Sequence, residues 1–258
     1  MTYESRLNSP ATGVIITGGA SGLGRATAEA VAAVGRPVSL WDLDAEKASS
    51  VAKEIGDRYD VVSQGMAVDV RDPDALMAGV EQTRERLPTL GGLVHAAGVV
   101  DTDSLDGLTV ESWDGGLNVH LRPLALLAQA LLPDLGRQPG SAIVTFSSIN
   151  ATLGNGINPI YSAAKGGALS LVRSLADRLA HDGIRINAIS PGMIRTPMMQ
   201  PSLDALSDEN FTRRILLERI GDPEEIGRVV RFLLSDEASY ITAAEIVVDG
   251  GNISSQRT

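Results

Sequence analysis

Short runs of β-branched and aliphatic residues alternate with longer helical patterns along almost the whole chain, and this alternation limits the fold more than any other feature. The predicted strands are 13–17, 37–41, 60–68, 91–96, 141–146, 184–190 and 245–249. The intervening segments whose apolar residues recur every three or four positions, as in helices, are 24–34, 72–87, 121–135 and 161–180. Strand–helix alternation requires crossover connections, which place helices on both faces of a parallel sheet. We therefore predict a single doubly wound α/β domain over 1–258, with a seven-stranded, mostly parallel sheet.

Local signals support this division of the chain. Asp72 is followed by Pro73, and Asp222 is followed by Pro223 and two glutamates. An N-cap acid with proline at the first helical position is typical of a helix N-terminus. Gly35 follows the first helical segment, as is typical of a helix C-terminus.

The charge and the cysteine content exclude several classes of protein. The net charge is −10 and no stretch is rich in basic residues, so a nucleic acid is not an expected partner. The chain has no cysteine and its three histidines are scattered, so we expect no disulfide, no thiolate chemistry and no metal site. The sequence shows no N-terminal signal pattern and no apolar run of about 18 residues, which predicts a cytoplasmic protein without a membrane span.

A glycine-rich turn joins the first predicted strand to the first predicted helix. The stretch ITGGASGLGRA (16–26) contains Gly18, Gly22 and Gly24, with Gly19 as an additional glycine. Glycines at a helix N-terminus let a pyrophosphate approach the free backbone N–H groups, and the helix dipole attracts the anion. The turn lacks the lysine of a nucleoside triphosphate loop, so it indicates a Rossmann-type dinucleotide site. The alternative is a turn that only packs strand against helix, which its position at the first crossover disfavours.

An aspartate at the end of the second predicted strand indicates which dinucleotide is bound. Asp42 lies eighteen residues after Gly24, about where a dinucleotide-binding unit places an acid that accepts hydrogen bonds from the adenosine ribose. A carboxylate repels a 2′-phosphate, so NAD is favoured over NADP. Ser21, where a basic residue would meet that phosphate, agrees with NAD. The alternative is that Asp42 caps the next helix, a role that Asp44 can also fill.

Several short motifs follow one another in order along the chain. They are TGGASGLG (17–24), Asp69-Val70, HAAG (95–98), Asn118, Ser148, YSAAK (161–165), SPGMIRTP (190–197) and VDGG (248–251). In this order they resemble the motifs of the short-chain dehydrogenase/reductase family, and the resemblance covers nearly the whole chain. His95 and Ala96 replace two asparagines of that pattern, and Ala243 stands where a glycine is common.

The resemblance implies a set of site residues. The implied catalytic residues are Asn118, Ser148, Tyr161 and Lys165. The residues expected to bind the cofactor are Gly18, Ser21, Gly22, Leu23, Gly24, Asp42, Leu43, Asp69, Val70, Ala97, Gly98, Tyr161, Lys165, Pro191, Gly192, Ile194 and Thr196. It also implies a homotetramer whose interfaces involve the helices after the fourth and fifth strands.

The spacing of Tyr161 and Lys165 suits proton transfer. Positions i and i+4 share one face of a helix, and a neighbouring ammonium favours the phenolate, so we expect Lys165 to lower the pKa of Tyr161. Tyr161 then serves as a general base for alcohol oxidation and as a general acid for ketone reduction. Ser148, at the end of a strand, can hydrogen-bond the substrate oxygen. By resemblance, Asn118 holds a water that completes a proton relay. The alternatives are a cap hydroxyl for Ser148, a surface residue for Asn118 and a helix-packing pair for Tyr161 and Lys165.

The segment around 193–220 is expected to form a substrate lid. Met193, Met198 and Met199 in or beside it suit an adaptable apolar pocket wall, although methionines at such spacing are also common in cores. Thr196 suits either a cofactor contact or a helix cap. We expect His120 to be structural or interfacial, because it faces another side of its helix than Asn118.

These features predict an NAD-dependent enzyme that interconverts a secondary alcohol and a ketone. The apolar, glycine-rich segment 149–159 and the lid favour a neutral, cyclic or steroid-like alcohol as the small-molecule substrate. One alternative is a 3-oxoacyl-carrier-protein-type ketoreductase that uses NADPH, for which Arg122 and Arg173 would be local docking cations. A second alternative is a non-catalytic NAD-binding regulator, which the presence of both Tyr161 and Lys165 disfavours.

Overall fold

The computed structural model describes residues 4–254 and contains one sheet of seven strands, all parallel. The strands are β1 Gly13–Thr17, β2 Val38–Asp42, β3 Ser63–Ala67, β4 Leu90–His95, β5 Ala142–Phe146, β6 Arg185–Pro191 and β7 Glu245–Val248. Their order in space is β3-β2-β1-β4-β5-β6-β7. The doubly wound α/β fold predicted from the sequence is confirmed, with parallel pairing throughout. The ends of the predicted domain, residues 1–3 and 255–258, lie outside the described residues.

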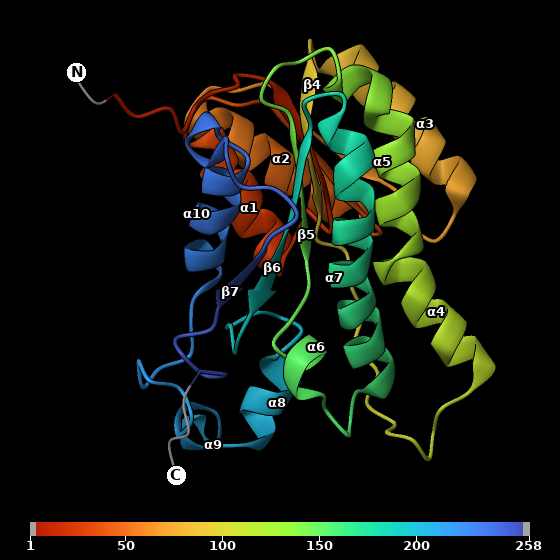
Figure 1. Ribbon diagram of the computed structural model, residues 1–258, viewed down its shortest axis with the longest axis vertical. Helices are drawn as coiled ribbons and strands as arrows, with labels where there is room; N and C mark the ends of the chain where they lie inside the picture. Colours follow the sequence, from red (N-terminus) through yellow and green to blue (C-terminus); the bar gives the residue numbers. More distant parts are fainter. Residues whose placement is uncertain (1–3, 255–258) are drawn as a thin grey trace.

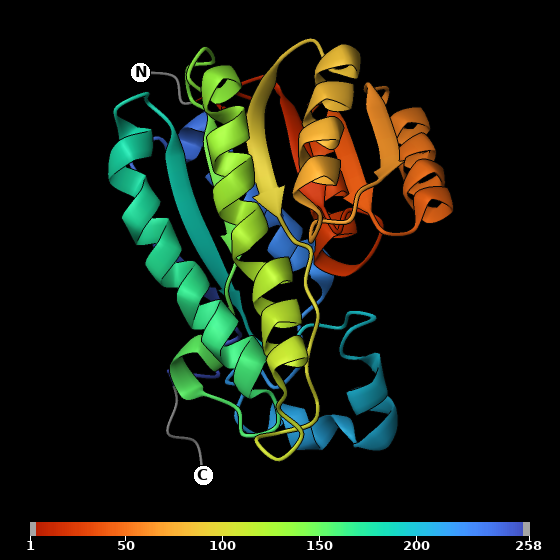
Figure 2. The ribbon, with the colours of Figure 1, turned by 90° about the vertical axis from the view of Figure 1, so that its right-hand side faces the viewer.

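Helices cover both faces of the sheet (Figure 1). They are α1 Gly22–Ala32, α2 Ala45–Tyr59, α3 Pro73–Arg86, α4 Val110–His120, α5 Arg122–Leu135, α6 Asn150–Leu153, α7 Pro159–Ala180, α8 Gln200–Ala205, α9 Asp208–Thr212, α10 Pro223–Leu233 and the 3₁₀ helix η1 Asp236–Ala238. Helices α1, α2 and α10 lie on one face, and α3, α4, α5 and α7 lie on the other (Figures 1 and 2). Among residues 4–254, no helix has the length and apolar character that crossing a bilayer requires.

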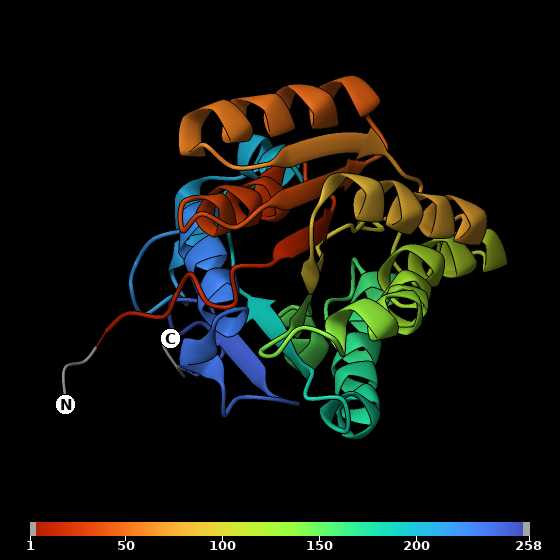
Figure 3. The same cartoon turned by 90° about the horizontal axis from the view of Figure 1, so that it is seen from above.

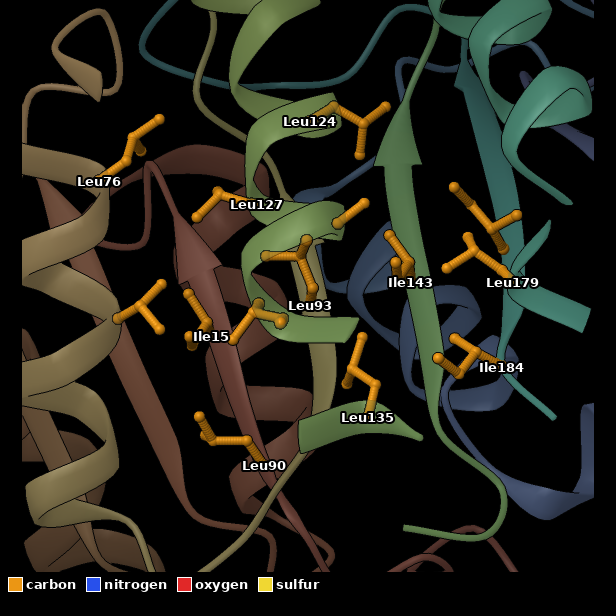
Figure 4. Close-up of a cluster of buried hydrophobic side chains, with 14 of the residues drawn as sticks. Ile15, Leu76, Leu90, Leu93, Leu124, Leu127, Leu135, Ile143, Leu179 and Ile184 are labelled. Carbon is orange, nitrogen blue, oxygen red and sulfur yellow. The ribbon is translucent and has the colours of Figure 1, made fainter. Parts of the chain in front are cut away.

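The central strands are buried on both faces because helices cover them. Every residue of β1, β4, β5 and β6 is buried, which explains their continuous apolar runs. On the α5 side, one core cluster joins Ile15, Leu93 and Ile143 from neighbouring strands to leucines of the covering helices (Figure 4). Each such buried side chain contributes about 1.5–3 kcal/mol of hydrophobic free energy.

Most element boundaries differ from the sequence prediction by one or two residues, and the difference is largest at β3. The predicted strand 60–68 is shorter, since Asp60 adopts a left-handed conformation (φ 53°) that ends α2, and β3 starts only at Ser63. Helix α7 starts at Pro159 rather than at 161. Both helices begin where predicted: Asp72 accepts the N–H of Asp74, and Asp222, which precedes α10, donates its N–H to the carboxylate of Glu225 at 2.9 Å.

The strand order places the candidate functional site at one edge of the sheet. All strands are parallel, so their carboxyl ends lie at the same edge, where α6, α8 and α9 are also found (Figure 1). The order reverses between β1 and β4, and the connections from these two strands lead to opposite faces of the sheet (Figure 3). Such a switch point opens a crevice beyond the carboxyl ends of the strands, which is where open α/β sheets bind ligands.

Candidate active site

A cavity of about 700 Å³ occupies this crevice. One end, which we call the cofactor end, is lined by the turn 18–24, Asp42 and Asp69. The other, the catalytic end, is lined by Ser148, Tyr161, Lys165 and the segment 193–211. All of the sequence-predicted site residues except Asn118 therefore meet in one cavity, although they come from the ends of six strands and from α7.

The glycines of the turn at the cofactor end are required by close backbone approach. Gly18 and Gly22 have positive φ values of 63° and 50°. A Cβ on Gly18 would lie 2.9 Å from the backbone of Ala97, and a Cβ on Gly24 would lie 2.0 Å from the carbonyl oxygen of Gly18. Side chains at these positions would fill the turn and displace the strand from the helix.

The first turn of α1 faces the cavity with its backbone N–H groups. Ser21, the residue before the helix, makes no cap hydrogen bond with its side chain within residues 4–254, and Ser21, Leu23 and Gly24 line the cavity. A helix N-terminus of this kind binds phosphate groups through its N–H groups and its dipole. The cradle therefore fits the pyrophosphate of a dinucleotide.

The carboxylate of Asp42 lies half-buried at the cofactor end. It accepts the N–H of Ala20 at 3.1 Å and that of Asp44 at 3.4 Å. Asp44, in contrast, caps α2 by accepting the N–H of Lys47 at 3.0 Å. The cap role that the sequence left open thus belongs to Asp44, and Asp42 lines the cavity together with Leu43.

Asp69 carries an ion pair at the cofactor end. Its carboxylate binds the guanidinium of Arg71 through both oxygens: Nε donates to Oδ1 at 2.9 Å and Nη2 to Oδ2 at 2.7 Å. This hydrogen bond holds the pKa of Asp69 below its usual value. Val70 lies buried between the two and lines the cavity beside them.

The catalytic end brings a hydroxyl, a phenol and an ammonium together. Ser148 follows β5 and lines the cavity with Tyr161, close enough for its hydroxyl to act on the pKa of the phenol. The Lys165 Nζ lies 5.3 Å from the centre of the Tyr161 ring and donates a hydrogen bond to the carbonyl oxygen of Phe146 at 2.8 Å. Both Ser148 and Lys165 are buried. Tyr161 and Lys165 are one turn apart on α7, as the spacing predicted.

The electrostatics at the catalytic end differ from the sequence prediction. Burial raises the pKa of Tyr161, and the hydrogen bond from Ser148 only partly opposes this effect. Burial also lowers the pKa of Lys165 to about 7, because the charged ammonium is desolvated. The expected lowering of the Tyr161 pKa by Lys165 is therefore absent in the protein alone: the spacing predicted proximity correctly but ignored desolvation.

Comparison with known proteins agrees with this geometry. The family described as enoyl-(acyl carrier protein) reductase matches residues 18–252. The "Probable galactose dehydrogenase GalD" of Rhizobium meliloti is 36% identical over 93% of this chain and 94% of its own length. The 3-oxoacyl-[acyl-carrier-protein] reductase FabG of Thermotoga maritima is 35% identical over 92% of this chain and 96% of its own length.

The chain belongs to the short-chain dehydrogenase/reductase family. Among solved structures, L-sorbose reductase from Gluconobacter frateurii, complexed with NADPH and L-sorbose, matches with a TM-score of 0.90 and 26% identity, covering 97% of this chain and all of that one. The protein is thus an oxidoreductase of this family, whose members use a nicotinamide cofactor.

The structure does not bring Asn118, the asparagine expected from the family motif, to the cavity. Asn118 is half-buried on α4 and is not among the lining residues. His120 on the same helix is buried and lines the catalytic end instead. Its ring packs edge-on against the ring of Tyr161, with 5.6 Å between the ring centres. The sequence predicted a structural or interfacial role for His120, because His120 and Asn118 lie on different sides of one helix and Asn118 was expected to face the site.

The buried position of His120 favours its neutral form. Its Nε2 lies 2.8 Å from the carbonyl oxygen of Val99, to which it donates, and 3.3 Å from the backbone N of the same residue. Its Nδ1 is buried and has no hydrogen-bond partner within the described chain. Burial, together with the charge of Lys165, lowers the pKa of His120 to about 2. The imidazole is therefore neutral at physiological pH.

His95, one of the departures from the family motif, lies in the sheet behind the cavity. Thr17 Oγ1 accepts the N–H groups of Ala96 and Ala97, so its proton points to His95 Nδ1, 2.9 Å away. His95 Nε2 then donates to the carbonyl oxygen of Val119 at 3.0 Å. This network ties β1, β4 and α4 together. Burial lowers the pKa of His95 to about 4, so the residue is neutral.

Two further sequence-predicted features have clear positions. The segment after β6 lines the cavity, including Met193, Met198 and Met199 as well as Pro191, Gly192, Ile194 and Thr196. At the other departure from the family motif, Ala243 itself adopts the left-handed conformation, with φ 56°. Its N–H donates to the carbonyl oxygen of Ile186 at 2.8 Å, so the turn before β7 is retained at the cost of backbone strain.

Proposed function

We propose that this protein is an NAD-dependent oxidoreductase that interconverts a neutral secondary alcohol and its ketone, with Tyr161 as the general acid/base. One observation carries the proposal: the hydroxyl of Ser148, the phenol of Tyr161 and the ammonium of Lys165 lie in the same cavity as the dinucleotide cradle. A base at a substrate hydroxyl and a separate hydride carrier are what such a reaction requires.

Each residue at the catalytic end has a role in this proposal. Tyr161 takes the proton from the alcohol in oxidation and returns it to the ketone oxygen in reduction. Ser148 hydrogen-bonds the same substrate oxygen and stabilises the charge that develops on it. Lys165, with a pKa of about 7, is able to exchange protons near neutral pH. When bound, the nicotinamide cofactor supplies or accepts the hydride.

The charges at the cofactor end support NAD rather than NADP. Among the described residues, the only lysine or arginine side chains that line the cavity are Arg71 and Lys165. Arg71 is held by both oxygens of Asp69, and Lys165 lies at the catalytic end. A 2′-phosphate would therefore meet the carboxylate of Asp42 without a free cation to balance it. The structurally similar L-sorbose reductase was solved with NADPH, so this difference has to be tested directly.

The walls of the catalytic end support a neutral substrate. Its apolar side chains include Met193, Met199 and Phe211, and its polar ones include Asn150 and Asn155. No carboxylate or guanidinium of the described chain lines this end. We propose that segment 193–220, with α8 and α9, acts as the substrate lid, and that a cyclic or steroid-like alcohol is the substrate.

The main rival is a ketoreductase for carrier-protein substrates, which the similarity to FabG keeps open. Such an enzyme needs basic residues that are available to an acidic partner. Arg122 and Arg173 are exposed, but Arg122 also donates to the carbonyl oxygen of Arg71, and Arg173 lies 3.9 Å from the carboxylate of Glu245. The net charge of −10 repels an acidic carrier protein. A non-catalytic NAD-binding regulator would have no use for the assembled catalytic end. These observations favour the small-molecule enzyme.

We further propose a cytoplasmic homotetramer that contacts its copies through α4, α5 and α7. Trp113 and Val110 at the start of α4 are exposed apolar side chains that suit such a contact. Light scattering after size-exclusion chromatography measures the assembly, and a monomer would contradict this part of the proposal.

The function is tested with a panel of secondary alcohols and ketones, each assayed with NAD(H) and NADP(H) by the absorbance of the reduced cofactor. We expect turnover of neutral cyclic compounds with a preference for NAD(H). A preference for NADPH together with turnover of 3-oxoacyl thioesters would establish the rival instead.

A further inference from the structure

Helix α7, which carries Tyr161 and Lys165, begins without a cap from its own sequence. Asn158, its N-cap residue, makes no cap hydrogen bond with its side chain within residues 4–254. Pro159 at the first helical position has no N–H. The first N–H groups of the helix that lack an intrahelical acceptor are therefore those of Ile160 and Tyr161. Such donors need acceptors from elsewhere when they are shielded from water.

Asp101 supplies both acceptors from a distant part of the chain. Its Oδ1 accepts the N–H of Tyr161 at 2.8 Å, and its Oδ2 accepts the N–H of Ile160 at 3.2 Å. Asp101 lies 60 residues before Tyr161, in the segment between β4 and α4. Its carboxylate also interacts favourably with the positive end of the helix dipole. Asp101 thus does for α7 what an N-cap residue normally does.

Two further hydrogen bonds join the same segments. The side-chain amide of Asn158 donates to the backbone carbonyl oxygen of Asp101, and the N–H of Ser104 donates to the carbonyl oxygen of Ile157 at 3.2 Å. The neighbours of Asp101, Val100 and Thr102, line the cavity. The wall of the catalytic end and the first turn of α7 are therefore one hydrogen-bonded unit.

We propose that Asp101 is a positioning residue for the reaction: it holds the first turn of α7 so that the hydroxyl of Tyr161 stays directed at Ser148. The proposal rests on the acid/base role of Tyr161 given above. Tyr161 belongs to that first turn, and its backbone N–H is bound directly by Asp101. Fraying of the turn would move the phenol, and a displacement of about 1 Å in a reacting group costs roughly a hundredfold in rate.

The test compares Asp101→Ala and Asp101→Asn with Asp103→Ala. Asp103 is exposed on the same segment and makes no side-chain hydrogen bond within the described residues, so it matches the charge change. We expect Asp101→Ala to lower kcat by about ten- to a hundredfold with the dissociation constant for the cofactor unchanged. Asp101→Asn, whose amide oxygen still accepts one N–H, should recover part of the loss, and Asp103→Ala should match the parent.

A second measurement is independent of turnover. Amide hydrogen exchange of Ile160 and Tyr161 should accelerate in Asp101→Asn but not in Asp103→Ala, while the middle of α7 stays protected. If Asp101→Ala does not fold, the exchange rates in Asp101→Asn decide. A kcat within twofold of the parent in Asp101→Ala, or unchanged exchange at both amides in Asp101→Asn, overturns the proposal. Failure of the acid/base role would show differently, as full turnover in Tyr161→Phe.

Discussion

At the cofactor end of the cavity the ligand surface is mostly backbone, whereas at the catalytic end it is made of buried side chains. The cofactor end relies on glycines and on the N-terminus of α1, with carboxylates at its rim. The catalytic end relies on Tyr161, Lys165 and His120, each with a pKa shifted by burial. Binding a common cofactor requires shape and donors, while moving a proton requires groups whose protonation has been tuned.

The largest effect on turnover is expected from removal of the Tyr161 hydroxyl at the catalytic end. Tyr161→Phe removes one hydroxyl and should lower kcat by about a thousandfold, because the acid/base group is lost. The dissociation constant for NAD should stay the same, since the cofactor end is untouched. Stopped-flow turnover and fluorescence titration measure the two quantities.

The control for this substitution is Tyr240→Phe, because Tyr240 is fully exposed. That variant should match the parent in both measurements. Full turnover in Tyr161→Phe would mean that another group transfers the proton.

The next largest effect is expected at the rim of the cofactor end. Asp42→Ala removes the carboxylate that repels a 2′-phosphate and should reduce the preference for NAD over NADP by about tenfold to a hundredfold. The ratio of kcat/KM values for the two cofactors measures the preference. Asp44→Ala, which removes only the cap of α2, should leave the ratio unchanged. A parent enzyme that prefers NADP would contradict the assignment of Asp42.

The positions of the residues at the cofactor end were easier to predict from the sequence, for a physical reason. Its contacts are local: a glycine turn between adjacent elements, and an acid at the end of the next strand. At the catalytic end, by contrast, His120 and Asp101 both contact Tyr161, which lies 41 and 60 positions later in the sequence. Single-sequence patterns report on neighbours within a turn or two, so they missed both.

The same limit explains the error in the pKa of Tyr161. The spacing of Tyr161 and Lys165 along a helix shows that they are close, but not how much water either retains. The fold itself was predictable, because the alternation of strands and helices and the caps at Asp72 and Asp222 are local patterns. The ends of strands, such as the start of β3, were less predictable, because the left-handed Asp60 has no distinctive sequence signal.

Histidines behind the catalytic end should make the protein sensitive to acid. His95 has a pKa near 4 in the folded protein, below the ordinary value of 6.5. The unfolded chain therefore binds more protons between these values, and folding stability falls as the pH drops from 6.5 towards 4. The slope for one such group approaches about 1.4 kcal/mol per pH unit.

His95→Asn should reduce this loss of stability, as measured by urea unfolding at pH 7 and pH 5. The exposed His181 provides the matched control, and His181→Asn should keep the slope of the parent. Equal slopes in the parent and in His95→Asn would show that His95 does not stay neutral in the folded state.

The smallest effect is expected far from both ends of the cavity. Ala243 holds a left-handed conformation that glycine adopts freely, so Ala243→Gly should stabilise the fold by about 1 kcal/mol. Ala244→Gly, at a neighbouring residue without positive φ, should instead be destabilising by about 0.5–1 kcal/mol. Thermal unfolding compares the two, and activity should be unaffected in both. Destabilisation by Ala243→Gly would indicate that the methyl group packs usefully.

The position of β1 in the sheet has a consequence for biosynthesis. Strands β1, β2 and β3 are made first, but β1 pairs with β2 on one side and with β4 on the other. Its second partner, Leu90–His95, leaves the ribosome more than 70 residues after Thr17. Until then β1 presents an open row of backbone donors and acceptors, a state that in the finished sheet belongs only to β3 and β7.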